Sequence, residues 1–239
     1  MAGFRIEWDF HKLGLSDDEL DLRFGDAARR WSNLITGFPK NDRGKPALKS
    51  LKIRVEMADL NAGRKKKDDL TLGHTEVTES LPKAAGRAAG IPTRALMQLD
   101  RKQFRTAVED RPEVVRDLIA HEVGHALGFG SCAPCTRLIE DRGRNRFFFI
   151  GRYAMKEYAA IGGKGAVPLE SSGNSATVGK HWDESTRDKS RLGRIMVYEL
   201  MSGNFDSGDN RLTRLTAAAM RDLGYEVDMD GADSYRDAD

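Results

Sequence analysis

Two histidines four positions apart, with a glutamate directly after the first, stand in the stretch HEVGHALGFGS at 121–131. If this stretch is helical, His121 and His125 project from the same face, because residues four apart lie about 40° from each other around the axis. Two neutral imidazoles so placed can bind one Zn²⁺ ion, and Glu122 can take a proton from a water on that ion. The predicted chemistry is metal-assisted hydrolysis.

A catalytic zinc ion needs a third protein ligand and one open position. In the pattern H-E-x-x-H-x-x-G-x-x-H, Gly128 is present, but Ser131 stands where the third histidine would be. The contexts of the later glutamates do not resemble the zinc-protease class whose third ligand is a glutamate: Glu140, Glu157 and Glu170. From the residues alone, the remaining candidates for a third ligand are His181, His11 and His74.

Two cysteines, Cys132 and Cys135, support a competing interpretation. Together with His121 and His125 they could close a structural zinc site with four ligands and no room for water, as in a binding module rather than an enzyme. The short loop between His125 and Cys132 argues against this site, and such a site has no use for Glu122. A disulfide or a pair of free thiols is the other expectation for the cysteines.

Periodic patterns predict the elements that must position these residues. Alternating apolar residues predict strands at 4–10 and 51–57, and a short apolar run predicts a third strand at 94–100. A capping box of Ser16 and Glu19 begins a helix that continues to about residue 35. Asp110 with Glu113 is expected to cap the helix at 111–128, which carries the histidines.

The sequence changes character after Gly130, where glycine- and serine-rich stretches predict mostly loop with one short amphipathic segment. A last helix is predicted at about 215–223, with Gly224 at its C-terminal end. The polar stretches at 61–68 and 228–233 are expected to be a solvated loop and a solvated tail.

The net charge and the lengths of the apolar runs limit the kinds of partner that can be expected for this protein. The chain has 239 residues, 39% of them hydrophobic, and its net charge is only +2, so no overall attraction to nucleic acid is expected. No apolar run is long enough to predict a membrane span, and residues 1–10 lack the pattern of a secretory leader. Partners therefore have to be inferred from the site.

Several motifs in order resemble the leishmanolysin-like metallopeptidases, a branch of the metzincins, and especially their compact bacterial members. These motifs are HEVGHALGFG, GKHWDES, ELMSG and RLTRLTAAAMRDLGYEV, with further likeness in FGDAARRWSNLITG and VPLESSGNSATVGKHW. In that branch an insertion separates the helix motif from the third histidine. The resemblance implies that one catalytic Zn²⁺ is bound by His121, His125 and His181, that Glu122 is the general base, and that Met201 forms a turn beneath the metal.

The resemblance also implies an α+β, metzincin-type fold with a twisted mixed β-sheet. An N-terminal lobe at 1–130 would hold the sheet, the first helix and the active-site helix. A loop-rich C-terminal lobe at 131–239 would hold the third ligand, the methionine turn and one main helix. The two lobes would form one catalytic domain. The implied activity is that of a monomeric, secreted endopeptidase acting on proteins or peptides, with the substrate extended along the strand near 95–100. The alternative is a non-catalytic zinc-binding, adhesion or effector module.

Overall fold

The computed structural model describes residues 4–63, 70–172, 177–184, 191–203 and 209–235. Its centre is a four-stranded mixed sheet in the order β1-β3-β5-β4, so the predicted α+β class with a mixed sheet is confirmed. The first three strands of that order run parallel, and β4 is antiparallel to β5. The strands are β1 (Ile6–His11), β3 (Leu51–Ala58), β4 (Gly73–Ser80) and β5 (Pro92–Asp100).

Alternation along the strands divides the sheet into a buried and an exposed face. In β3, Leu51, Ile53 and Val55 are buried, while Lys52 and Arg54 between them are exposed. The three predicted strands are therefore confirmed as β1, β3 and β5. Because β5 pairs with β3 on one side and with β4 on the other, it has no free edge for a substrate, and that part of the prediction is wrong.

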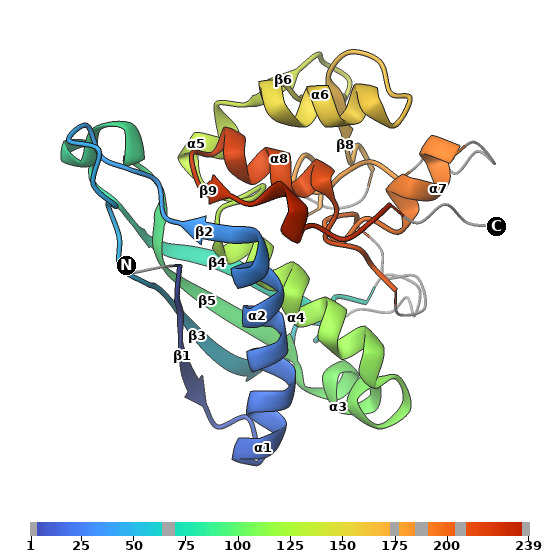
Figure 1. Cartoon of the computed structure of the whole chain (residues 1–239). Coiled ribbons are helices and arrows are strands. Elements are labelled where there is room, and N and C mark those ends of the chain that lie inside the picture. Colours follow the sequence, from blue (N-terminus) through green and yellow to red (C-terminus); the bar gives the residue numbers. More distant parts are fainter. Residues whose placement is uncertain (1–3, 64–69, 173–176, 185–190, 204–208, 236–239) are drawn as a thin grey trace.

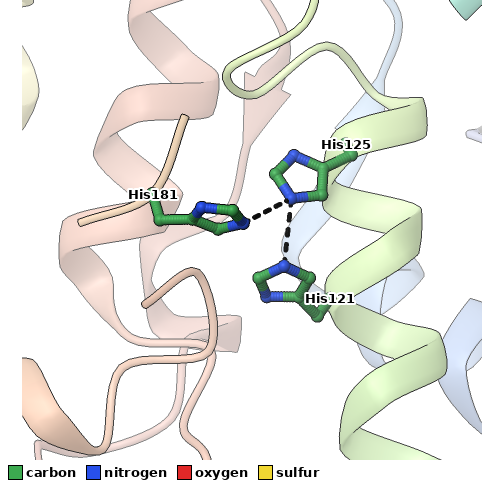
Figure 2. Close-up of side chains that lie close together, drawn as sticks. All are labelled: His121, His125 and His181. Carbon is green, nitrogen blue, oxygen red and sulfur yellow. Dashed lines mark hydrogen bonds between the residues drawn. The ribbon is translucent and has the colours of Figure 1, made fainter. Parts of the chain in front are cut away.

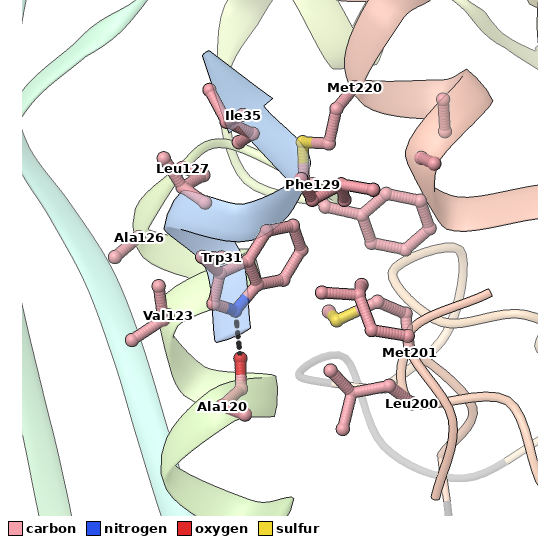
Figure 3. Close-up of a cluster of buried hydrophobic side chains, with 14 of the residues drawn as sticks. Trp31, Ile35, Ala120, Val123, Ala126, Leu127, Phe129, Leu200, Met201 and Met220 are labelled. Atoms are coloured by element: carbon pink, nitrogen blue, oxygen red, sulfur yellow. Dashed lines mark hydrogen bonds between the residues drawn. The ribbon is translucent and has the colours of Figure 1, made fainter. Parts of the chain in front are cut away.

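Helices cover the buried face of the sheet (Figure 1). The first begins at the predicted capping box of Ser16 and Glu19 and continues as α1 (Asp17–Leu20), a π-helical segment η1 (Asp21–Gly25) and α2 (Asp26–Leu34). Trp31 of α2 is fully buried, and its indole Nε1–H donates to the carbonyl of Ala120 at 2.7 Å, as Figure 3 shows. This bond fixes α2 against the helix that carries the histidines.

That helix is α4 (Pro112–Ala126), and the prediction that Asp110 caps it is wrong. A separate helix, α3 (Arg101–Asp110), precedes it, and its N-terminal cap is Asp100, whose carboxylate accepts from the backbone N–H groups of Lys102 and Gln103. Asp110 therefore ends α3. α4 begins without a side-chain cap, with Pro112 at its first position, where the missing N–H costs nothing.

The chain after residue 130 holds more regular structure than its composition predicts. A three-stranded antiparallel sheet and several helices lie there, with α6 packed on α8 (Figure 1). The helix predicted at 215–223 is confirmed as α8, capped by Thr213. The α-helices of this part of the chain and the strands of its three-stranded sheet are α5 (Ala133–Thr136), β6 (Ile139–Asp141), β7 (Phe147–Phe149), α6 (Arg152–Ala160), β8 (Val167–Leu169), α7 (Arg191–Val197) and α8 (Arg214–Asp222).

Short elements complete the described fold. β2 (Ile35–Gly37) pairs with β9 (Glu226–Val227), and the 3₁₀ segments are η2 (Lys83–Ala88) and η3 (Met229–Gly231). No helix among the described residues is long and apolar enough to cross a membrane. The loop predicted at 61–68 falls mainly on residues 64–69, which lie outside the described residues. The division into lobes at residue 130 stays a prediction.

A buried ionic network joins α2, α4 and the end of the chain. Asp117 of α4 is fully buried and accepts from the Arg30 guanidinium at 3.0 Å and from the Asn210 backbone N–H at 2.9 Å. Arg30 also contacts Asp233 at 3.0 Å, and the Leu212 N–H donates to the same carboxylate at 2.7 Å. The stretch 228–233 is therefore not the solvated tail that its composition predicts, because Asp233 is held by these donors.

The network predicts a cost for removing Arg30. Arg30→Leu leaves the buried Asp117 carboxylate with only the more distant and partly exposed Arg116 guanidinium, at 3.4 Å, so the free energy of unfolding should fall by about 3 kcal/mol in urea titrations. The neighbouring Arg29 makes only an exposed ion pair with Asp26. Arg29→Leu should therefore change stability by no more than about 0.5 kcal/mol. Equal losses in the two variants would contradict the assigned role of Arg30.

Candidate metal centre

Helix α4 places His121 and His125 on one face, as their spacing predicts, and buries both rings. The His121 ring nitrogen Nδ1 lies 2.7 Å from the carbonyl oxygen of Leu200, and His125 Nδ1 lies 2.9 Å from that of Phe129. A carbonyl can only accept, so each Nδ1 carries the proton and donates it. The Nε2 atom of each ring is therefore unprotonated.

His181 reaches the same point from a distant part of the chain. Its ring is buried, and Nδ1 lies 3.1 Å from the carbonyl oxygen of Thr177, which again leaves Nε2 unprotonated. The Nε2 atom of His125 is 3.0 Å from that of His121 and 3.0 Å from that of His181, as Figure 2 shows. Three imidazoles thus turn their unprotonated nitrogens toward one point.

This arrangement fits a metal ion. Three lone pairs cannot hydrogen-bond to one another, and a cation between them removes their repulsion. Tetrahedral zinc with Zn–N bonds of 2.0–2.1 Å would separate its ligand nitrogens by about 3.3 Å, close to the spacing found here. Among the described residues, these three form the one group of histidine, cysteine or acidic side chains whose ligand atoms converge in this way. The three histidines can therefore hold a metal ion.

Burial keeps the three rings neutral, as metal binding requires. It lowers the pKa of His121 to about 3 and that of His181 to about 3, and it also lowers the pKa of His125 well below its usual value. Neutral imidazole is the form that binds zinc. Each Nδ1–H bond to a carbonyl fixes the tautomer and the ring orientation, which is how the surroundings of a metal usually orient histidine ligands.

Glu122 directly follows His121 in α4, and its buried carboxylate occupies a space that depends on a glycine. A Cβ atom added at Gly73 of β4 would lie 2.7 Å from Glu122 Oε1, so the carboxylate occupies space that only glycine leaves open. Burial raises the pKa of Glu122 to about 7, and the nearby Thr75 hydroxyl partly opposes this. Glu122 Oε2 is buried and has no hydrogen-bond partner in the part of the chain that the structure describes. This oxygen can accept a proton.

Met201 packs against α4 at Gly124. It is fully buried beside Trp31, Val123 and Phe129 (Figure 3). Its sulfur lies so close to Gly124 that any Cβ at that position would overlap it. Gly124, one residue before His125, therefore lets the methionine reach the helix backbone. The family resemblance implied a role for Met201, but the sequence alone did not explain why a glycine stands at position 124.

The two cysteines lie outside the histidine cluster. Cys132 and Cys135 are buried free thiols, and burial raises the pKa of Cys132 to about 11 and that of Cys135 to about 12. Neither sulfur belongs to the converging group of ligand atoms. The structure therefore gives no support to a closed His/Cys site, and of the two expected states of the cysteines it has the free thiols.

The other two histidines are not brought into the cluster. His11 is exposed at the end of β1. His74 lies in β4, close enough to the centre for electrostatic interaction with His125 and Lys180, but its nitrogens are not among the converging atoms. Of the three candidates for a third ligand, the fold thus places His181 with His121 and His125.

Sequence patterns did not single out Asp117 and Glu199, two fully buried carboxylates that support the centre. Asp117 stands one helical turn before His121, so its place on the buried face of α4 was a usable signal. Glu199 precedes the Met201 turn, and its partner Thr213 caps α8. No local pattern relates residues 199 and 213.

Comparison with models of known protein families gave no match, and no curated protein matched the chain.

Zinc binding is the direct test of the cluster. Zinc at one hundred times its dissociation constant should stabilise the protein by about 2.7 kcal/mol, and a chelator should reverse the effect. His181→Ala should abolish most of this stabilisation, measured by thermal unfolding and equilibrium dialysis. His11→Ala and the double variant Cys132→Ser, Cys135→Ser should bind zinc as the unchanged protein does. Loss of zinc from the cysteine variant, with binding kept in His181→Ala, would favour the His/Cys site.

Proposed function

We propose that this protein is a zinc-dependent endopeptidase of the leishmanolysin-like metzincin type. The observation that carries the proposal is the convergence of three unprotonated Nε2 atoms, with that of His125 3.0 Å from each of the other two, together with the buried carboxylate of Glu122, the residue after His121. Three neutral nitrogen ligands and an adjacent carboxylate are the parts that metal-assisted hydrolysis requires. The ordered motifs around His181 and Met201 favour peptides as the substrate class.

In this proposal His121, His125 and His181 hold the zinc ion. When bound, zinc supplies a Lewis acid that polarises a carbonyl and makes a water molecule more acidic. Glu122 accepts the proton of the attacking water at its unpaired Oε2 and delivers it to the departing amine.

The substrate would lie along β4 rather than along β5. β4 is at the end of the sheet order, and in the described part of the chain its outer edge pairs with no strand. It also begins beside the site, where Gly73 lies against Glu122 and Thr75 is buried. An extended peptide can add to such an edge through backbone hydrogen bonds.

Glu122→Gln tests the catalytic part of the proposal. The amide cannot accept the proton, so cleavage of an unfolded protein should fall by about 10³-fold while zinc affinity is kept. Cleavage products are measured by mass spectrometry, and bound zinc by atomic absorption. Glu109→Gln, the same change at an exposed carboxylate of α3, is the matched control and should retain activity. A fully zinc-loaded protein that cleaves no peptide would instead favour a binding or adhesion role.

The position of the substrate has its own test. In an extended peptide, alternate backbone N–H groups point to opposite sides. N-methylation at alternate residues therefore removes the N–H donors on one side of the peptide and leaves those on the other side. One alternate set should raise KM by about fivefold for each lost bond, because a backbone hydrogen bond contributes about 1 kcal/mol, while the other set should be cleaved normally. Equal cleavage of both sets would rule out pairing along β4.

A further inference from the structure

The turn Glu199–Ser202 contacts the surroundings of two of the three histidines. The carbonyl oxygen of Leu200 accepts from His121 Nδ1–H at 2.7 Å. The next carbonyl, that of Met201, accepts from the backbone N–H of Trp182 at 2.9 Å, and Trp182 directly follows His181. The position of this turn therefore affects the orientation of His121 and the backbone next to His181.

The side chain of Glu199 holds the turn in place. It is fully buried, and its Oε2 accepts from the Met201 backbone N–H at 2.8 Å. Its Oε1 accepts from the Thr213 hydroxyl at 2.8 Å and from the Thr213 N–H at 3.3 Å. Thr213 is the N-terminal cap of α8, and its Oγ1 accepts from the Leu215 N–H. Glu199 thus ties the turn to the start of a buried helix.

This carboxylate is expensive to bury. Burial raises the pKa of Glu199 to about 7, and no lysine or arginine among the described residues forms an ion pair with it. A leucine would fill a similar volume without the cost of desolvating a charge. The contribution of Glu199 therefore lies in the donors that it orders. These are the Met201 N–H in the turn and the N–H and hydroxyl of Thr213 at the helix cap.

We propose that Glu199 is a positioning residue for the metal centre. By holding the turn, it places the Leu200 carbonyl so that His121 keeps its Nδ1–H tautomer and its ring orientation. Removal of Glu199 should weaken metal binding although all three ligands remain. This inference rests on the metal site of the proposed function, and it extends the set of functional residues beyond the ligands and the general base.

Two substitutions separate the hydrogen bonds from the packing. In Glu199→Gln, one amide oxygen can still accept from the Met201 N–H, but the amide group then faces the Thr213 N–H as a second donor. Glu199→Leu keeps the volume and removes every acceptor. Zinc affinity, measured by competition with a chelator, should fall by about tenfold or more in Glu199→Leu and less in Glu199→Gln.

Asp222 provides matched controls. Its carboxylate is half-buried at the end of α8 and accepts from the backbone N–H groups of Tyr153 and Ala154 at the start of α6. Asp222→Leu removes a comparable bond between a carboxylate and a helix terminus elsewhere on α8, and Asp222→Asn keeps one accepting oxygen, as Glu199→Gln does. Both should lower the unfolding temperature and leave zinc affinity unchanged.

A spectroscopic measurement distinguishes positioning from general destabilisation. The Nδ1 proton of His121 in the zinc-loaded protein reports its hydrogen bond to Leu200 and is observable by NMR with labelled histidine. Both Glu199 variants should shift this resonance, with Glu199→Gln closer to the unchanged protein, and both Asp222 variants should leave it in place.

The outcomes are separable. If the Glu199 variants keep the zinc affinity and the His121 resonance of the unchanged protein, as the Asp222 variants should, the positioning role is overturned. The metal site itself is not affected by that result. If Glu199→Leu does not fold, the resonance and affinity of Glu199→Gln decide alone. A failure of the unchanged protein to bind zinc would overturn the proposed function, and the positioning role with it.

Discussion

The convergence of three neutral imidazoles is the constraint on which the rest of the structure depends. Each Nδ1 proton is donated to a backbone carbonyl, so three unprotonated Nε2 atoms meet in a buried space with 3.0 Å between neighbours. Such an arrangement is unfavourable without a cation, and burial prevents the rings from becoming charged instead. The fold must therefore hold His121, His125 and His181 firmly enough to offset their mutual repulsion.

Two sets of buried contacts meet this demand, and both join segments far apart in the sequence. Arg30 and Asp117 connect the first helix to α4 and, through Asp233, to the end of the described chain. On the other side of the cluster, the turn at 199–202 holds His121 by one carbonyl and the segment of His181 by the next. Because α4 contributes to both sets, a shift of this helix disturbs every ligand.

Small residues decide how closely the surrounding elements approach. Gly73 leaves room for the carboxylate of Glu122 at the start of β4, and Gly124 admits the side chain of Met201 against α4. The first glycine lets the Glu122 carboxylate lie against β4, the last strand in the sheet order. The second lets a large apolar side chain support the helix between its two histidines. Both glycines thus let a buried side chain approach α4 or β4 more closely than any larger residue would allow.

Local patterns in the sequence determined the elements and part of the site. Apolar alternation was sufficient for β1 and β3, the Ser16 capping box for the first helix, and a four-residue spacing for the shared face of His121 and His125. The choice among His11, His74 and His181 was open to the residues alone, and only the tertiary structure brings His181 to the other two. The same holds for the buried partners of Asp117 and Glu199, for the place of β4 at the end of the sheet order, and for the contacts that hold Asp233. Periodicity reports which side of one element is apolar, whereas these contacts join positions tens of residues apart, and they exist only once the elements have packed.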